Sequence, residues 1–74
     1  MDKWQLFKLQ LEQRITTQKE TINNLSLAYG QHYADSNSAI QHNNVLILLV
    51  SLLEQMELLE KYENITPLND PSNQ

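Results

Sequence analysis

Residues 45–53 read Val-Leu-Ile-Leu-Leu-Val-Ser-Leu-Leu, and all but Ser51 are large and apolar. This run is too short for a membrane span, which needs about twenty apolar residues. The polar residues Gln-His-Asn-Asn precede it at 41–44, and glutamates interleave with the leucines that follow it. The stretch is therefore expected to be the apolar centre of a helix, on which the rest of the chain packs.

The N-terminal part of the chain predicts a helix over residues 3–29. Asp2 is suited to cap its start, and Gly30 is suited to end it in a left-handed conformation. Between them, apolar residues recur at spacings of three and four, as on one face of a helix. This predicted stripe consists of Trp4, Phe7, Leu11, Ile15, Ile22, Leu25 and Tyr29.

A second helix is predicted over about residues 38–63, after a polar loop at 30–37. Ser38 with Gln41 resembles a capping box, although Asp35 or Ser36 would also suit an earlier start. At the other end, Asn64 can take a left-handed cap position and Pro67 bars further helix. Residues 1–65 thus form one helical domain, and residues 66–74, with two prolines and no apolar periodicity, are predicted to be a disordered tail.

Two helices of similar length joined by a short polar loop predict an all-α fold, an antiparallel hairpin. Pairing across the loop joins positions whose numbers sum to about 67, which places Leu11 opposite Met56 and Lys8 near Glu57 and Glu60. From the second helix, the predicted hairpin core takes Val45, Leu49, Leu52, Met56 and Leu59.

Other apolar residues point away from this core and require a second interface. A helix that is apolar nearly all round belongs inside a larger core, and a lone hairpin has one internal interface. We therefore expect the chain to dimerise into a four-helix bundle. The predicted dimer interface consists of Ile40, Ile47, Val50 and Leu58 with Leu6 and Leu9.

Composition argues against several classes of function. The net charge of −4, without basic clustering, disfavours a nucleic-acid binder. The absence of cysteine excludes disulfides and thiolate metal sites, and His32 and His42 lack metal-ligand spacing. No catalytic constellation is present, so neither enzymatic activity nor a cofactor is expected. With no secretory signal pattern, the expected location is the cytoplasm.

These observations favour a small non-enzymatic interaction protein, an adaptor or regulator that binds a protein partner as a homodimer. Candidate partner contacts are Tyr33 and His32 in the loop, and Glu57 and Glu60 on the second helix. Tyr33 could instead fold back over the end of the bundle. Two alternatives are an acidic inhibitor of a nucleic-acid enzyme, acting through the 54–63 glutamates, and a structural subunit of a larger assembly. The eight asparagines and eight glutamines are compatible with a phage, prophage or plasmid gene, by association only.

Overall fold

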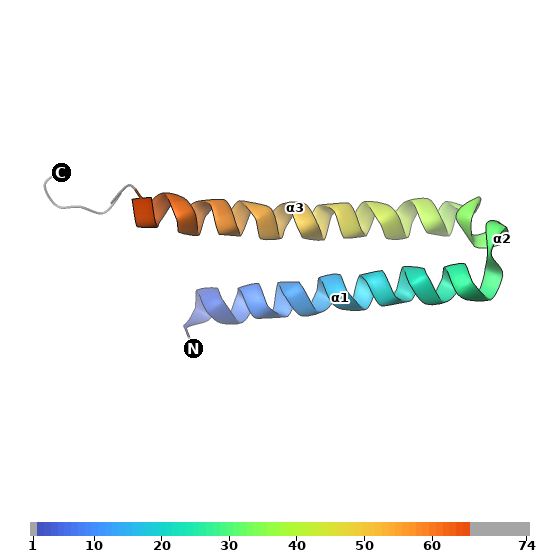
Figure 1. The fold of residues 1–74 in the computed structure, drawn as a ribbon, viewed down its shortest axis with the longest axis horizontal. Helices are drawn as coiled ribbons and strands as arrows, with labels where there is room; N and C mark the ends of the chain where they lie inside the picture. The colour runs from blue at the N-terminus through green and yellow to red at the C-terminus, as the bar shows by residue number, and fades with distance from the viewer. Residues whose placement is uncertain (1, 66–74) are drawn as a thin grey trace, which may run out of the picture.

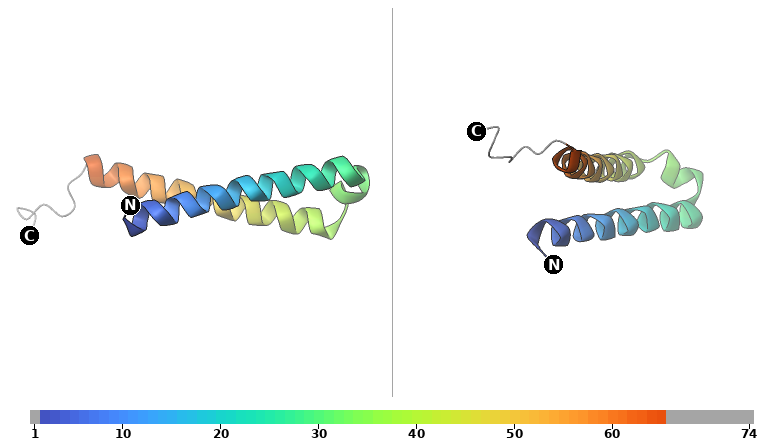
Figure 2. Two further views of the ribbon diagram at one scale, coloured as in Figure 1. Left: turned by 90° about the horizontal axis from the view of Figure 1, so that it is seen from below. Right: turned by 60° about the vertical axis from the view of Figure 1, so that its left-hand side comes forward.

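The protein is described by a computed structural model that covers residues 2–65, and this part of the chain is all helical. Its elements are α1 (Lys3–Tyr29), α2 (Gln31–Ala34) and α3 (Asn37–Ile65). The two long helices run antiparallel in a single layer, and α2 turns the chain at one end (Figures 1 and 2). The predicted antiparallel hairpin is confirmed. The predicted tail at 66–74 lies outside the described residues.

The ends of α1 follow from its capping residues. Asp2 Oδ1 accepts a hydrogen bond from the backbone N–H of Gln5 at 2.7 Å, which satisfies one of the donors left free at a helix start. At the other end, Gly30 has φ +55°, and its N–H donates to the carbonyl of Ser26 at 2.8 Å. A glycine adopts positive φ without the penalty that a Cβ imposes. The predicted range of 3–29 is therefore confirmed.

The connection is more ordered than the predicted loop, because it contains the single helical turn α2. The start of α3 is capped by Ser36, whose Oγ accepts from the N–H of Ala39 at 3.1 Å and donates to the carbonyl of Tyr33 at 2.6 Å. Ser36 rather than Ser38 is thus the cap, and α3 begins at Asn37. The helix also continues past the predicted cap at Asn64, to Ile65.

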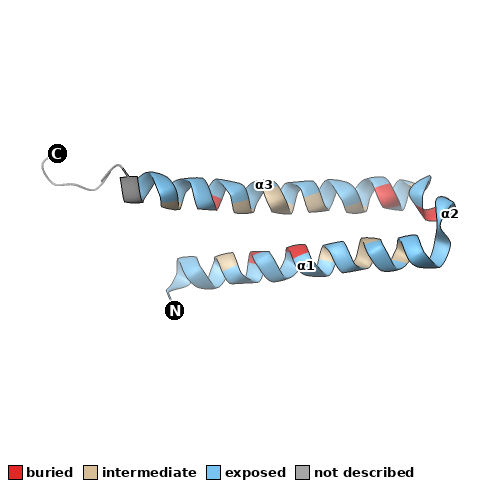
Figure 3. Cartoon of the chain, viewed as in Figure 1, coloured by how far each residue is buried: buried red, intermediate tan, exposed pale blue. Residues whose placement is uncertain are grey.

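The hairpin core is small and lies between α1 and α3 towards their open ends (Figure 3). Leu11 and Met56 are each 3% exposed and cluster with Ile15, as the predicted opposition of Leu11 and Met56 requires. The partly buried side chains packed on this cluster all come from α3: Leu46, Leu49, Val50 and Leu53.

The face of α3 that meets α1 differs from the predicted one. Val45, Leu52 and Leu59, assigned to the hairpin core, are exposed, while Val50, assigned to the dimer interface, packs on the core. The contact face instead follows a heptad pattern of buried or half-buried residues: Ala39, His42, Leu46, Leu49, Leu53, Met56 and Glu60. On α1, Ile22 and Leu25 are half-buried, whereas Trp4, Phe7 and Tyr29 are exposed despite their place in the predicted stripe.

Candidate functional site

Polar side chains lie on the contact face of both helices, and their partners fix how the helices meet. Near the open end, Lys8 Nζ donates to Glu60 Oε1 and Trp4 Nε1 donates to Glu60 Oε2, each at 2.8 Å. The hydrogen bond to Glu60 raises the pKa of Lys8. The hydrogen bonds from Lys8 and Trp4 lower the pKa of Glu60. Both oxygens of Glu60 are therefore engaged within the hairpin, which weakens its predicted role as a partner contact.

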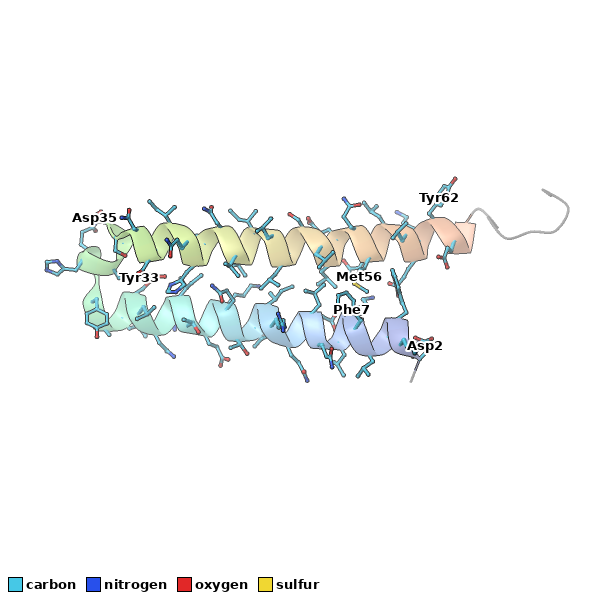
Figure 4. All side chains as sticks on the ribbon, turned by 180° about the vertical axis from the view of Figure 1, so that it is seen from behind. Asp2, Phe7, Tyr33, Asp35, Met56 and Tyr62 are labelled. Atoms are coloured by element: carbon cyan, nitrogen blue, oxygen red, sulfur yellow. The ribbon has the colours of Figure 1, made fainter. Side chains whose placement is uncertain are left out.

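A second polar group lies at the bend. Gln18 Nε2 donates to the backbone carbonyl of His42 at 2.9 Å, and the hydroxyl of Tyr33 lies 2.9 Å from His42 Nδ1. Tyr33 is 6% exposed and folds in over the end of the hairpin, as Figure 4 shows. The tyrosine therefore takes the folded-back position rather than the partner-contact position. His32 and Glu57, the other two candidate contacts, are exposed.

The main feature of the surface is an exposed apolar stripe along α3. Val45, Leu52 and Leu59 follow one another at intervals of seven residues, close to two helical turns, so they lie along one line of the helix. Leu48 and Tyr62 lie three residues after the first and last of them and widen that line. We call these residues the outer stripe: Val45, Leu48, Leu52, Leu59 and Tyr62. They are 43–68% exposed, with Leu48 the most open.

Val45 of the outer stripe also lines a groove between α1 and α3 that contains a single charged residue. This open groove is lined by Gln10, Arg14 and Gln18 of α1 and by Val45 and Leu49 of α3, among others. Arg14 carries the only charge of the groove lining. The paired Lys8 and Glu60 lie at a different part of the contact. Phe7 of α1 is 50% exposed and is level with Met56 along the hairpin in Figure 4.

The residues predicted to form the dimer interface do not make one continuous surface. Ile40, Ile47 and Leu58 are exposed on α3, and Leu6 and Leu9 are exposed on α1. At 100° per residue, Leu6 and Leu9 point away from the Leu11 side of α1, which faces α3. A single interface therefore cannot contact Leu6 and Leu9 on the far side of α1 together with the exposed isoleucines and Leu58 of α3. The apolar pattern does not separate the outer stripe from the core, because Leu46 and Leu53 of the contact face repeat at the same seven-residue spacing as Val45, Leu52 and Leu59.

Within residues 2–65, the structure contains no cluster of three or more histidine, aspartate or glutamate side chains able to hold a metal ion. None of the helices described is both long and apolar enough to cross a membrane. No protein-family model, curated protein or solved structure matches the chain. The apolar surface of α3 is therefore the feature from which a function has to be inferred.

Proposed function

We propose that this protein is a non-enzymatic helical interaction protein that acts as a homodimer and binds a protein partner. The observation that supports this proposal is the apolar surface that α3 leaves uncovered. Large aliphatic side chains on both its outer stripe and its Ile47 side are exposed, including Leu48 at 68% and Ile47 at 61%. Exposed apolar surface of this extent is typical of sites that bind other proteins.

The size of the core supports the same proposal. Only five apolar residues of the described chain are buried, and no side chain is less than 2% exposed. Domains of fewer than about 80 residues seldom gain enough stability from one core without staples or association. This chain has no cysteine and therefore no disulfide. Association with a second copy would supply the missing burial.

Thermal unfolding at several protein concentrations tests the homodimer. A dimer that unfolds to monomers becomes more stable as protein concentration rises, because association favours the folded state by mass action. We expect the melting temperature, followed by helical circular dichroism, to increase between micromolar and submillimolar protein. A melting temperature independent of concentration over that range would contradict a dimer in equilibrium with unfolded monomer.

Binding of a protein partner is tested with a substitution of Ile47, which lies on α3 outside the outer stripe. Affinity capture from cells that express the protein should retain a partner on the wild type and lose it on Ile47→Glu. Leu27→Glu, at the most exposed leucine of α1, is the control that changes charge equally elsewhere. Equal capture by wild type and Ile47→Glu would contradict a partner site on this part of α3.

The geometry gives less support to an acidic inhibitor. Such a function would need the carboxylates of the 54–63 segment to be free for a basic partner, yet Glu60 is engaged by Lys8 and Trp4. We therefore do not propose it as a second function.

A further inference from the structure

We propose that the outer stripe of α3 packs against the outer stripe of a second copy, with the two α3 helices antiparallel and a two-fold axis beside Leu52. This inference rests on the proposed homodimer and identifies its pairing face and direction. It assigns the dimer contact to Val45, Leu48, Leu52, Leu59 and Tyr62, and leaves Ile40, Ile47 and Leu58 outside it.

The spacing of the stripe is symmetric about Leu52. Val45 lies seven residues before it and Leu59 lies seven residues after it. A two-fold axis at Leu52 therefore sets Val45 opposite Leu59 of the second copy, and Leu52 opposite its own equivalent. In such an interface, residue i meets residue j and residue j meets residue i, so a self-complementary pattern is required. Val45, Leu52 and Leu59 have that pattern, and Leu48 and Tyr62 lie beside their line.

The charges on α3 favour the antiparallel direction. Glu54, Glu57, Glu60 and Glu63 lie in the C-terminal half, with Lys61 as the only cation there, whereas residues 41–44 are Gln-His-Asn-Asn. An axis at Leu52 sets the acidic half of one copy beside the amide-rich start of α3 in the other. Parallel α3 helices would place the two acidic halves side by side, and like charges brought together at an interface are unfavourable.

The exposed area of the outer stripe is close to what a stable dimer needs. The five stripe residues average about half exposure. Taking roughly 150–200 Å² for a fully exposed large side chain, these five residues present about 440 Å² of surface per copy. A standard interface buries about 800 Å² per partner, of which about 60% is apolar, or about 500 Å².

The side of the hairpin that carries the groove is suited to this contact. Its lining contains one charged residue, Arg14, so a second copy would desolvate few charges as it approached. Pairing on the Ile47 side would bring the interface next to Glu54, which follows Ile47 by seven residues, and next to Lys61, which also borders Leu59 and Tyr62 of the outer stripe. Burying these charges costs free energy unless they gain partners.

Two adjacent residues test which face is used. Leu48 and Ile47 are exposed to a similar degree in the hairpin, 68% and 61%, so Leu48→Glu and Ile47→Glu are matched variants that should both stay helical. We expect sedimentation equilibrium to give a monomer for Leu48→Glu and a dimer for Ile47→Glu. A dimer that persists in Leu48→Glu and is lost in Ile47→Glu would overturn the assignment of the face.

Spin labels on the outer side of α3 test direction and register. The chain has no cysteine, so Asn37→Cys, Asn44→Cys and Ser51→Cys each give one labelled, exposed site, and the three share one helix line. With 1.5 Å rise per residue, an axis at Leu52 separates equivalent labels along the helix by about 45, 24 and 3 Å respectively. The pulsed dipolar distance should therefore be shortest at Ser51 and longest at Asn37.

Three similar distances would show that the helices are parallel. A shortest distance at Asn37 or Asn44 would show a different register. Either result overturns the proposed pairing but is compatible with the homodimer. No dipolar coupling, together with a monomer mass for the unlabelled protein, would overturn the pairing and the proposed homodimer together.

Discussion

Truncation of Leu11 is expected to remove a large part of the stability of the hairpin. Leu11 is 3% exposed and contributes one of the three buried side chains of the core between α1 and α3. Leu11→Ala removes three carbon atoms, and at about 0.8 kcal/mol per buried CH₂ the lost transfer free energy is about 2.4 kcal/mol. A residual cavity normally adds to this loss, which gives a range of about 2–5 kcal/mol in well-packed cores.

The single-layer architecture places the expected cost towards the low end of that range. The core is open on both sides of the hairpin, so neighbouring side chains or water can occupy the space that the truncation leaves. We expect a loss of about 2–3 kcal/mol in the free energy of unfolding. A core of this size seldom supplies more than about 3–5 kcal/mol of stability. The free energy of unfolding of Leu11→Ala should therefore be close to zero at room temperature.

Urea unfolding followed by circular dichroism measures this loss, with all proteins at the same concentration. Leu27→Ala is the matched control, because Leu27 is 78% exposed on the same helix and the change in helix propensity is the same. The control should differ from the wild type by less than about 0.5 kcal/mol. If Leu11→Ala were as mild as Leu27→Ala, the packing of α1 on α3 through Leu11 would be refuted.

Three further predictions concern the ends and the polar contacts of the hairpin. Ser36→Ala should lower the free energy of unfolding by about 1 kcal/mol, because it removes the cap of α3. Ser38→Ala, the control, should change it little in the same thermal or urea unfolding experiment. A larger effect for Ser38→Ala than for Ser36→Ala would contradict the observed start of α3. Tyr33→Phe should cost about 1 kcal/mol in the same assays by removing one side-chain hydrogen bond, and a variant as stable as the wild type would show that this bond contributes nothing. Glu60→Gln should lower the melting temperature most between pH 4.5 and 10.5. The pKa of Glu60 is lowered in the folded protein, so the stability that the ion pair contributes is lost as the pH falls below 4.5. The pKa of Lys8 is raised, so the same contribution is lost as the pH rises above 10.5. A Glu60→Gln effect that is the same at pH 3 and pH 7 would contradict that ion pair.

The bounds of α1 and the antiparallel pairing could be predicted from the sequence because their signals are local and unambiguous. Asp2 and Gly30 flank one long periodic segment, and each occupies the position that its chemistry suits. The numerical pairing across the bend then gave the Lys8–Glu60 contact, since two long helices in register leave little freedom along their length.

The connection could not be predicted in the same way. Four residues are too few to show helical periodicity, so α2 leaves no pattern in the sequence. The choice between Ser36 and Ser38 depends on α2, because the turn brings the carbonyl of Tyr33 within reach of the Ser36 hydroxyl.

The rotation of α3 could not be predicted because the run at 45–53 is apolar on nearly every side. Hydrophobicity alone therefore allows either Val45 and Leu52 or Leu46 and Leu53 to face α1. Polar contacts distinguish the observed rotation. Glu60 lies on the heptad line of Leu46 and Leu53 and accepts hydrogen bonds from Lys8 and Trp4, and the backbone carbonyl of His42, on the line of Leu49 and Met56, accepts one from Gln18. These polar groups gain partners in the observed rotation, which the apolar pattern alone does not select.

Sedimentation equilibrium of the wild-type protein at several concentrations tests most directly whether a second copy covers the apolar face of α3. The proposed homodimer predicts a mass of about 17 kDa, twice the 8.6 kDa of the chain, at micromolar concentration and above. A mass of 8.6 kDa at every concentration would contradict it and would mean that the outer stripe is left open in the free protein.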